Sequence, residues 1–71
     1  MVLTDATSFG DALRARRRNL DLSQDAVAEL IGVNRRVVGE LERGKGSVRL
    51  EIALAAARAL GIDIELRARE R

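Results

Sequence analysis

The chain of 71 residues contains no cysteine, no histidine, no tryptophan and no tyrosine. Without cysteine it has neither a disulfide framework nor a thiolate metal site, which suits a cytosolic protein. Without histidine it lacks the commonest metal ligand and the commonest general base. No glycine-rich phosphate loop makes up for these gaps. The sequence therefore predicts a protein that is not an enzyme and has no cofactor or metal.

Aromatic residues and long apolar runs are also scarce. Phe9 is the single aromatic residue, so the predicted core is aliphatic, even though 46% of the chain is apolar. No run approaches the ~18 apolar residues of a membrane-spanning helix, and the N-terminus lacks the apolar stretch of a signal peptide. We therefore expect one small cytoplasmic domain with no membrane partner.

Basic residues occur in local excess. The net charge is only +2, from 13 Lys and Arg against 11 Asp and Glu, but cations crowd residues 14–18 and 35–49. Local clusters of this kind indicate a nucleic-acid partner. The alternative is a set of solvated helix faces with scattered counter-charges, and charge alone does not decide between the two.

Capping residues predict where the first helix lies. The pattern S-x-x-D at residues 8–11 is typical of a capping box, so we expect the helix to begin at Ser8. It should end within residues 18–21, because Asn and Asp tolerate the left-handed terminal conformation. Residues 1–7 show no periodicity and are predicted to form a flexible N-terminal arm.

Two more helices should follow in close succession. Ser23 is the expected N-cap of the second helix, and Gly32 should end it in the left-handed conformation. Asn34 is the expected N-cap of the third helix, which gives way to a loop at residues 44–46. Two helices joined by a short glycine-containing turn form a helix-turn-helix unit, in which the first helix braces the second against a major groove.

The last third of the chain predicts a helix and a strand. The helix should begin between Ser47 and Arg49 and end at Gly61. The residues expected on its buried face are Leu50, Ala53, Leu54, Ala57 and Leu60. Residues 62–69 then alternate between apolar and polar, which is typical of a half-buried strand. The predicted division is an arm at 1–7, a DNA-binding domain at 8–61, and a dimerisation strand with a tail at 62–71.

An isolated strand leaves its backbone donors and acceptors unpaired, so we expect it to pair with the same strand of a second copy. This homodimer interface would bury Ile62, Ile64 and Leu66. The alternatives are that the strand folds back on its own domain or is disordered.

Residues that contact DNA are expected on and around the third helix. The predicted base-reading residues are Asn34, Arg35, Arg36 and Glu40, and the predicted phosphate-binding residues are Gln24, Arg43 and Lys45. An arginine fork matches guanine, and a glutamate can accept from cytosine. Asn34 could instead cap the helix or hold a phosphate, and Glu40 could orient Arg36 one turn away. For Arg35 and Arg36 the alternative is a solvated surface pair.

Gly39 is unusual inside a helix, where glycine costs about 1 kcal/mol relative to alanine. Glycine at this position either lets the helix lie close to the duplex or arose by evolutionary drift at an exposed site. The sequence does not separate these two interpretations.

The stretch from Leu22 to Gly46 resembles the Xre/Cro-type helix-turn-helix family of repressors and regulators. The matching residues are Leu22-Ser23-Gln24, Ala28, Gly32-Val33, Val38 and Leu41–Lys45. The resemblance implies a mainly α, four- to five-helix, lambda-repressor-like DNA-binding domain, here followed by the short strand. It also implies a phosphate role for Gln24, base reading at the start of the third helix, and an ion pair between Arg17 and Glu42. Two positions depart from the pattern: Asp21 stands where glycine is usual, and Gly39 where a longer side chain is common.

The tail from Ser47 onward resembles that of HipB-like antitoxins, in which two copies pair their strands across a dimer axis. The resemblance implies a bacterial repressor, nucleoid-associated when bound to DNA, that recognises a palindromic operator. It also implies a HipA-like serine/threonine kinase toxin as partner. Similar domains act alone, so a stand-alone Xre-type regulator remains an alternative, as does a protein-interaction module that has lost DNA binding.

Overall fold

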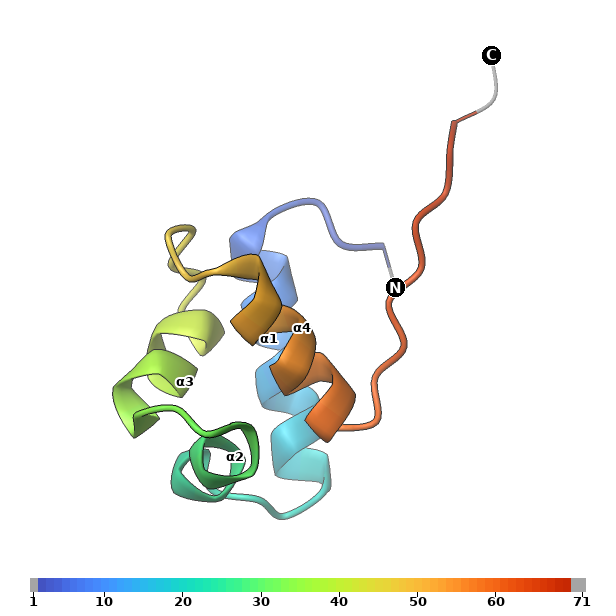
Figure 1. Cartoon of the computed structure of the whole chain (residues 1–71). Coiled ribbons are helices and arrows are strands. Elements are labelled where there is room, and N and C mark those ends of the chain that lie inside the picture. Colours follow the sequence, from blue (N-terminus) through green and yellow to red (C-terminus); the bar gives the residue numbers. More distant parts are fainter. Residues whose placement is uncertain (1, 70–71) are drawn as a thin grey trace.

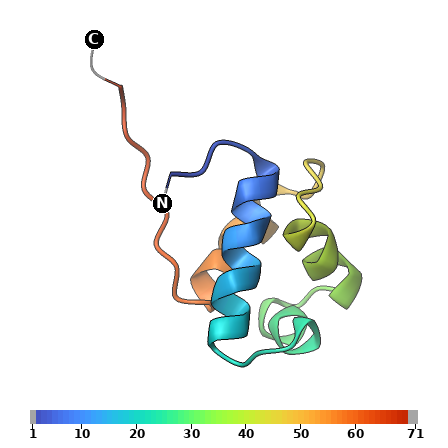
Figure 2. The same cartoon turned by 180° about the vertical axis from the view of Figure 1, so that it is seen from behind.

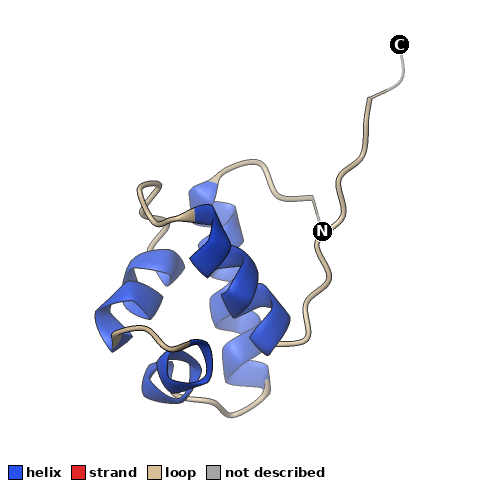
Figure 3. Ribbon diagram, in the orientation of Figure 1, coloured by secondary structure: helices blue, strands red, loops and turns tan. Residues whose placement is uncertain are grey.

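The computed structural model describes residues 2–69, which form four helices joined by short loops (Figures 1 and 2). These are α1 (Ala6–Asn19), α2 (Gln24–Ile31), α3 (Arg35–Glu42) and α4 (Leu50–Ala59). All regular secondary structure in this range is helical (Figure 3). The mainly α fold class is thereby confirmed. Across these residues, no helix has the length and apolar character needed to cross a membrane.

Helix α1 begins two residues earlier than predicted. Its N-cap is Asp5, whose Oδ1 accepts a hydrogen bond from the Ser8 amide at 2.8 Å, while the Ser8 hydroxyl accepts from the Asp5 amide at 3.2 Å. The hydrogen bond from the Ser8 amide to the carboxylate, with a smaller contribution from the Ser8 side chain, holds the pKa of Asp5 below its usual value. The prediction that Ser8 starts the helix was therefore wrong: Ser8 is the third helical residue of a capping box that begins at Asp5. Residues 6 and 7, expected in the arm, belong to the helix.

The caps predicted for α2 and α3 are confirmed. The Ser23 hydroxyl accepts from the Ala26 amide at 3.0 Å, and Asn34 Oδ1 accepts from the Arg36 amide at 2.9 Å. Gly32 ends α2 in the left-handed conformation, with φ of 73°. Only three residues therefore separate two helices that cross at a steep angle (Figure 1).

The helices enclose an aliphatic core, as predicted. Its buried apolar residues are Leu13, Val27, Ala28, Val38, Leu41, Ala56, Ala57 and Leu60. Phe9 is partly buried and packs against this cluster. The predicted face of α4 was wrong in part, because Leu50 and Leu54 are exposed and lie outside the cluster. The side of α4 that faces the core instead carries the buried Ala56 and Ala57, with Ile52 and Ala53 partly buried beside them.

Arg16 of α1 forms a hydrogen bond to the C-terminal end of α4. Its Nε donates to the Leu60 carbonyl at 2.9 Å, which satisfies one of the acceptors left free at a helix C-terminus. Gly61 follows with a left-handed φ of 69°, as expected for a residue that ends a helix.

Gly10 sets the contact between α1 and α3. It is buried, and a Cβ added there would lie 2.3 Å from the Leu41 carbonyl oxygen. Backbone cannot yield as a flexible side chain can, so only glycine fits without moving α3. The sequence did not point to this role.

We expect Gly10→Ala to destabilise the fold by about 1–3 kcal/mol, as overpacking does elsewhere, even though alanine is the better helix former. Gly46→Ala is the matched control, because Gly46 has a negative φ and nothing lies within 4 Å of its added Cβ. Denaturant unfolding of both variants measures the difference. Equal midpoints would contradict the close contact.

Residues 62–69 run away from the helical body as an extended loop (Figures 1 and 3). The strand predicted there is not present in the single chain, because a strand requires a second backbone to pair with. Ile62 packs against the core, and its amide donates to the Ala57 carbonyl at 2.9 Å. Ile64 and Leu66 are 42% and 96% exposed. Residues 70–71 of the predicted tail lie outside the described residues.

Candidate nucleic-acid interface

Helix α3 is divided lengthwise into a buried side and an exposed side. Val38 and Leu41 lie in the core, while Asn34, Arg35 and Arg36 are exposed. Helix α2 packs against both α3 and α4, and α1 supports α3 from the other side. The first turn of α3 is thus presented to solvent by a rigid frame.

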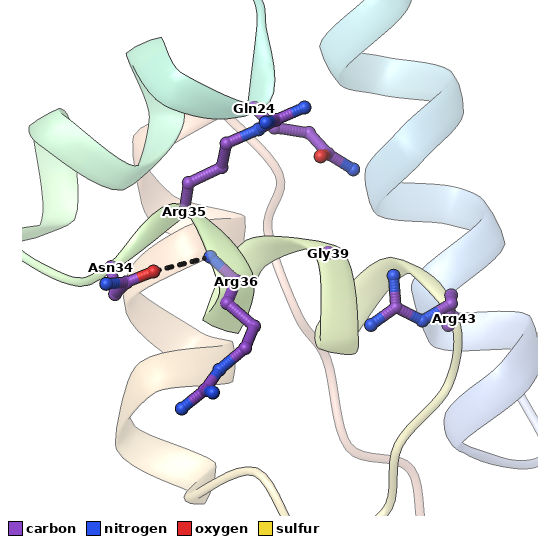
Figure 4. Close-up of a pocket in the computed structure, with 6 residues that line it drawn as sticks. All are labelled: Gln24, Asn34, Arg35, Arg36, Gly39 and Arg43. Atoms are coloured by element: carbon purple, nitrogen blue, oxygen red, sulfur yellow. Dashed lines mark hydrogen bonds between the residues drawn. The ribbon is translucent and has the colours of Figure 1, made fainter.

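The exposed side of α3 forms one wall of a shallow hollow of about 360 Å³ (Figure 4). The residues that line it are Gln24, Asn34, Arg35, Arg36, Gly39 and Arg43. The structure therefore brings together three of the four predicted base-reading residues and two of the three predicted phosphate-binding residues. Arg35 extends towards Gln24, whereas Arg36 projects to the opposite side of the helix (Figure 4). Among the residues that the structure describes, no acidic residue lines this hollow.

Two acidic residues sit beside the cations of this surface. Arg35 Nε lies 3.7 Å from Asp25 Oδ1, and both side chains are well exposed. Lys45 Nζ donates to Glu40 Oε2 at 3.1 Å. This bond holds the pKa of Glu40 below its usual value, with smaller contributions from Arg36 and Arg43. Glu40 and Lys45, assigned to base and phosphate contacts respectively, thus pair with each other, and neither lines the hollow.

The ion pair implied between Arg17 and Glu42 is present. Arg17 Nε donates to Glu42 Oε2 at 2.6 Å and Arg17 Nη2 to Glu42 Oε1 at 3.0 Å, with side chains only 12% and 5% exposed. Burial alone would raise the pKa of Glu42, but hydrogen bonds from Arg17 and Gln24 outweigh it and hold that pKa below its usual value. The same pair raises the pKa of Arg17.

Gln24 connects this buried pair to the surface. Its Nε2 donates to Glu42 Oε1 at 3.1 Å, which fixes the amide beside the hollow and leaves one amide hydrogen free. Because α1, α2 and α3 each contribute one member, the network holds the start of α2 and the end of α3 in register.

Asp21, in the turn before α2, adopts a positive φ of 56°. Positive φ favours glycine, the usual residue of the family pattern at this position, and aspartate is one of the few other residues that adopt it. Asp21 therefore takes a left-handed conformation that a glycine would also allow.

An exposed first turn on the second of two closely spaced helices, lined with arginines and framed by a buried ion pair, defines a helix-turn-helix DNA-binding domain. The helix-turn-helix family model matches residues 13–66. The chain is 43% identical over 49 residues to an HTH-type transcriptional regulator of Methanothermobacter thermautotrophicus, covering 69% of this chain and 71% of the relative. The chain therefore belongs to the helix-turn-helix family, of the Xre type, and is a DNA-binding transcriptional regulator.

Solved structures share this fold. HipB in a complex with the O4 20mer superposes with a TM-score of 0.88 at 16% identity, covering 99% of each chain. HipB in a HipA-HipB-O2-O3 complex gives 0.89 at the same identity. The restriction-modification controller protein C.AhdI from Aeromonas hydrophila gives 0.73 at 41% identity, covering 82% of this chain and 88% of that one.

Proposed function

We propose that this regulator is a dimeric transcriptional repressor of the HipB-like antitoxin type, which binds a palindromic operator and neutralises a HipA-like kinase toxin. The observation that carries the proposal is the hollow on α3, whose lining within residues 2–69 includes Arg35, Arg36 and Arg43 and no acidic residue. Guanidinium groups at this position suit guanine edges in a major groove and the phosphates that flank it.

The proposed roles divide between bases and backbone. Arg35 and Arg36 read bases, and Asn34 caps α3 through its oxygen while its amide nitrogen remains free to donate. Gln24 and Arg43 bind phosphates from the rim of the hollow. Glu40 and Lys45 contact DNA only after their mutual ion pair opens, so we assign them the weaker contributions.

A second copy of the chain supplies the missing partner for residues 62–69. Pairing two tails would satisfy one row of backbone groups and cover the exposed Ile64 and Leu66. Ile62 already packs on its own core, so it anchors the tail where it leaves α4. A two-fold axis between the tails would place two reading helices about 34 Å apart, one turn of DNA.

Ile64→Asp should convert the dimer to monomers, because a charge would be buried against the partner tail. Ile64→Val is the matched control and should remain dimeric. Sedimentation equilibrium at micromolar concentration distinguishes them. The monomer fold should survive the change because Ile64 lies outside the core cluster. A dimer that persists in Ile64→Asp would mean that the interface lies elsewhere.

Operator recognition can be tested without knowing the operator. Duplexes that bind the protein are first selected from a library of randomised sequences. The affinity of the protein for the selected duplexes is then measured from about 50 to 200 mM salt. We expect inverted repeats with half-sites about one helical turn apart and a steep fall of affinity with salt. Failure to enrich any sequence would favour the protein-interaction module instead.

A stand-alone regulator is the second candidate, favoured by the 41% identity to the controller protein C.AhdI. Co-expression of this chain with a HipA-like kinase separates the two candidates. The antitoxin proposal expects the two proteins to co-purify and the growth arrest caused by the kinase to be relieved. Sequence-specific DNA binding without such a complex would support the stand-alone regulator.

A further inference from the structure

A second hollow, of about 230 Å³, adjoins the first. The residues that line it are Arg14, Arg17, Gln24, Gly39, Glu42 and Arg43. Gln24, Gly39 and Arg43 line both hollows, so the two meet above Gly39. Neither the family pattern nor the proposed contacts assign a role to Arg14 or Gly39.

Gly39 keeps this meeting point open. It is buried in the interior of α3, where glycine destabilises a helix relative to alanine. A Cβ added at Gly39 would lie 3.2 Å from Arg43 Nη1 and 3.8 Å from Gln24 Oε1. Figure 4 shows the Arg43 guanidinium turned back towards Gly39. A side chain here would therefore push the Arg43 guanidinium, the flexible end of an exposed side chain, away from its place over Gly39.

The second hollow is lined by positively charged side chains that can bind an anion. Arg14 and Arg43 are exposed, and neither forms an ion pair within residues 2–69. Glu42 is the single carboxylate that the described part of the chain contributes to the lining, and Arg17 neutralises it through two hydrogen bonds. Two guanidinium groups that line the same small hollow and form no ion pair within residues 2–69 suit a tetrahedral anion, because each can give a forked pair of donors to its oxygens.

We propose that Gly39 forms the base of a seat, that is a binding site, for one DNA phosphate, which is contacted both by Arg14 of α1 and by Arg43, the residue that follows α3. The inference deepens the proposed function and rests on it, because the anion is a phosphate of the bound duplex. The free amide hydrogen of Gln24 adds a third donor. The seat makes Arg14 a DNA-contacting residue, and it explains why α3 tolerates a glycine in its interior.

Two variants test the seat against a selected duplex. Gly39→Ala should reduce affinity by about tenfold, the scale of one lost charge-assisted contact, while its melting temperature stays equal to or above that of the wild type. Arg14→Gln should flatten the plot of log affinity against log salt, but by less than the value of about 0.9 per protomer for a whole phosphate, because Arg43 still neutralises part of the charge of that phosphate. Arg58→Gln, an exposed arginine that lines neither hollow, is the matched control and should leave both quantities unchanged.

The possible results test the phosphate seat and the proposed function separately. Wild-type protein that binds no duplex overturns the proposed function and the seat with it. Wild-type protein that binds DNA, together with Arg14→Gln showing the same salt slope as Arg58→Gln, overturns the seat alone. Wild-type affinity in Gly39→Ala also overturns it. The Arg14 result decides the question even if Gly39→Ala disturbs α3, because Arg14 is exposed and outside the core.

Discussion

Replacing Glu42 with alanine should lower the free energy of unfolding by about 3 kcal/mol, the cost of leaving a buried charge without its partner. Arg17 would keep only its bond from Nη1 to the Leu22 carbonyl, at 2.8 Å. Gln24 would lose its acceptor, so the start of α2 would loosen from α3. Denaturant unfolding monitored by circular dichroism measures the loss.

The matched control is Glu51→Ala, which breaks an arginine–glutamate pair on the surface. Arg49 and Glu51 are both well exposed, and such pairs contribute at most about 1 kcal/mol. Equal losses in Glu42→Ala and Glu51→Ala would mean that burial adds nothing to the Arg17–Glu42 pair.

The effect of Glu42 should depend on pH in a defined direction. Its pKa in the folded chain lies below the usual value of 4.5, so the unfolded chain binds more protons between the two values. The stabilisation is therefore complete above pH 4.5 and is lost as the pH falls through the folded pKa. The difference in stability between wild type and Glu42→Ala should narrow over that interval. A difference independent of pH down to 2.5 or so would contradict the assignment.

Arg36→Ala and Arg35→Ala should each weaken binding to a selected operator by about 1–3 kcal/mol and relax the base preference at one position of each half-site. Both side chains are exposed, so the folding stability should change little. Arg35 lies beside the exposed Asp25 and would have to give up this ion pair in order to contact DNA. The loss of the pair offsets part of the binding free energy that Arg35 contributes. We therefore expect the larger loss for Arg36.

Fluorescence anisotropy with the operator and with a scrambled duplex, at one fixed salt concentration, separates base reading from phosphate contact. A base-reading residue changes the ratio of the two affinities, whereas a phosphate-binding residue lowers both alike. Equal losses on the two duplexes would reassign Arg35 and Arg36 to the backbone.

The sequence predicted the central helices well because their limits are set locally. Ser23, Gly32 and Asn34 each act on residues within a few positions of themselves. The start of α1 was placed late because two overlapping patterns compete there, and the aspartate at position 5 caps the helix while Ser8 completes its box. The strand could not be tested in the same way, because it depends on a second chain.

The site was predictable only where helix position alone decides exposure. Arg35 and Arg36 follow an N-cap, so their exposure on a braced helix could be expected. The positions of Gly10, Gly39 and Arg14 depend on how closely α1 and α2 approach α3, which spacing along the chain does not reveal. The glycines inside helices were the available signal, because glycine there has a cost that needs a reason.

The lengthwise division of α3 has a consequence for how such regulators diversify. The residues that would choose an operator and the residues that hold the helix in place are different residues of one short segment. If Arg35 and Arg36 read bases as proposed, exchanging either would change the preferred operator at little cost in folding stability, whereas Glu42 and its contacts would stay the same. Paralogues in one genome can in this way acquire separate targets by a few surface replacements while keeping a common scaffold.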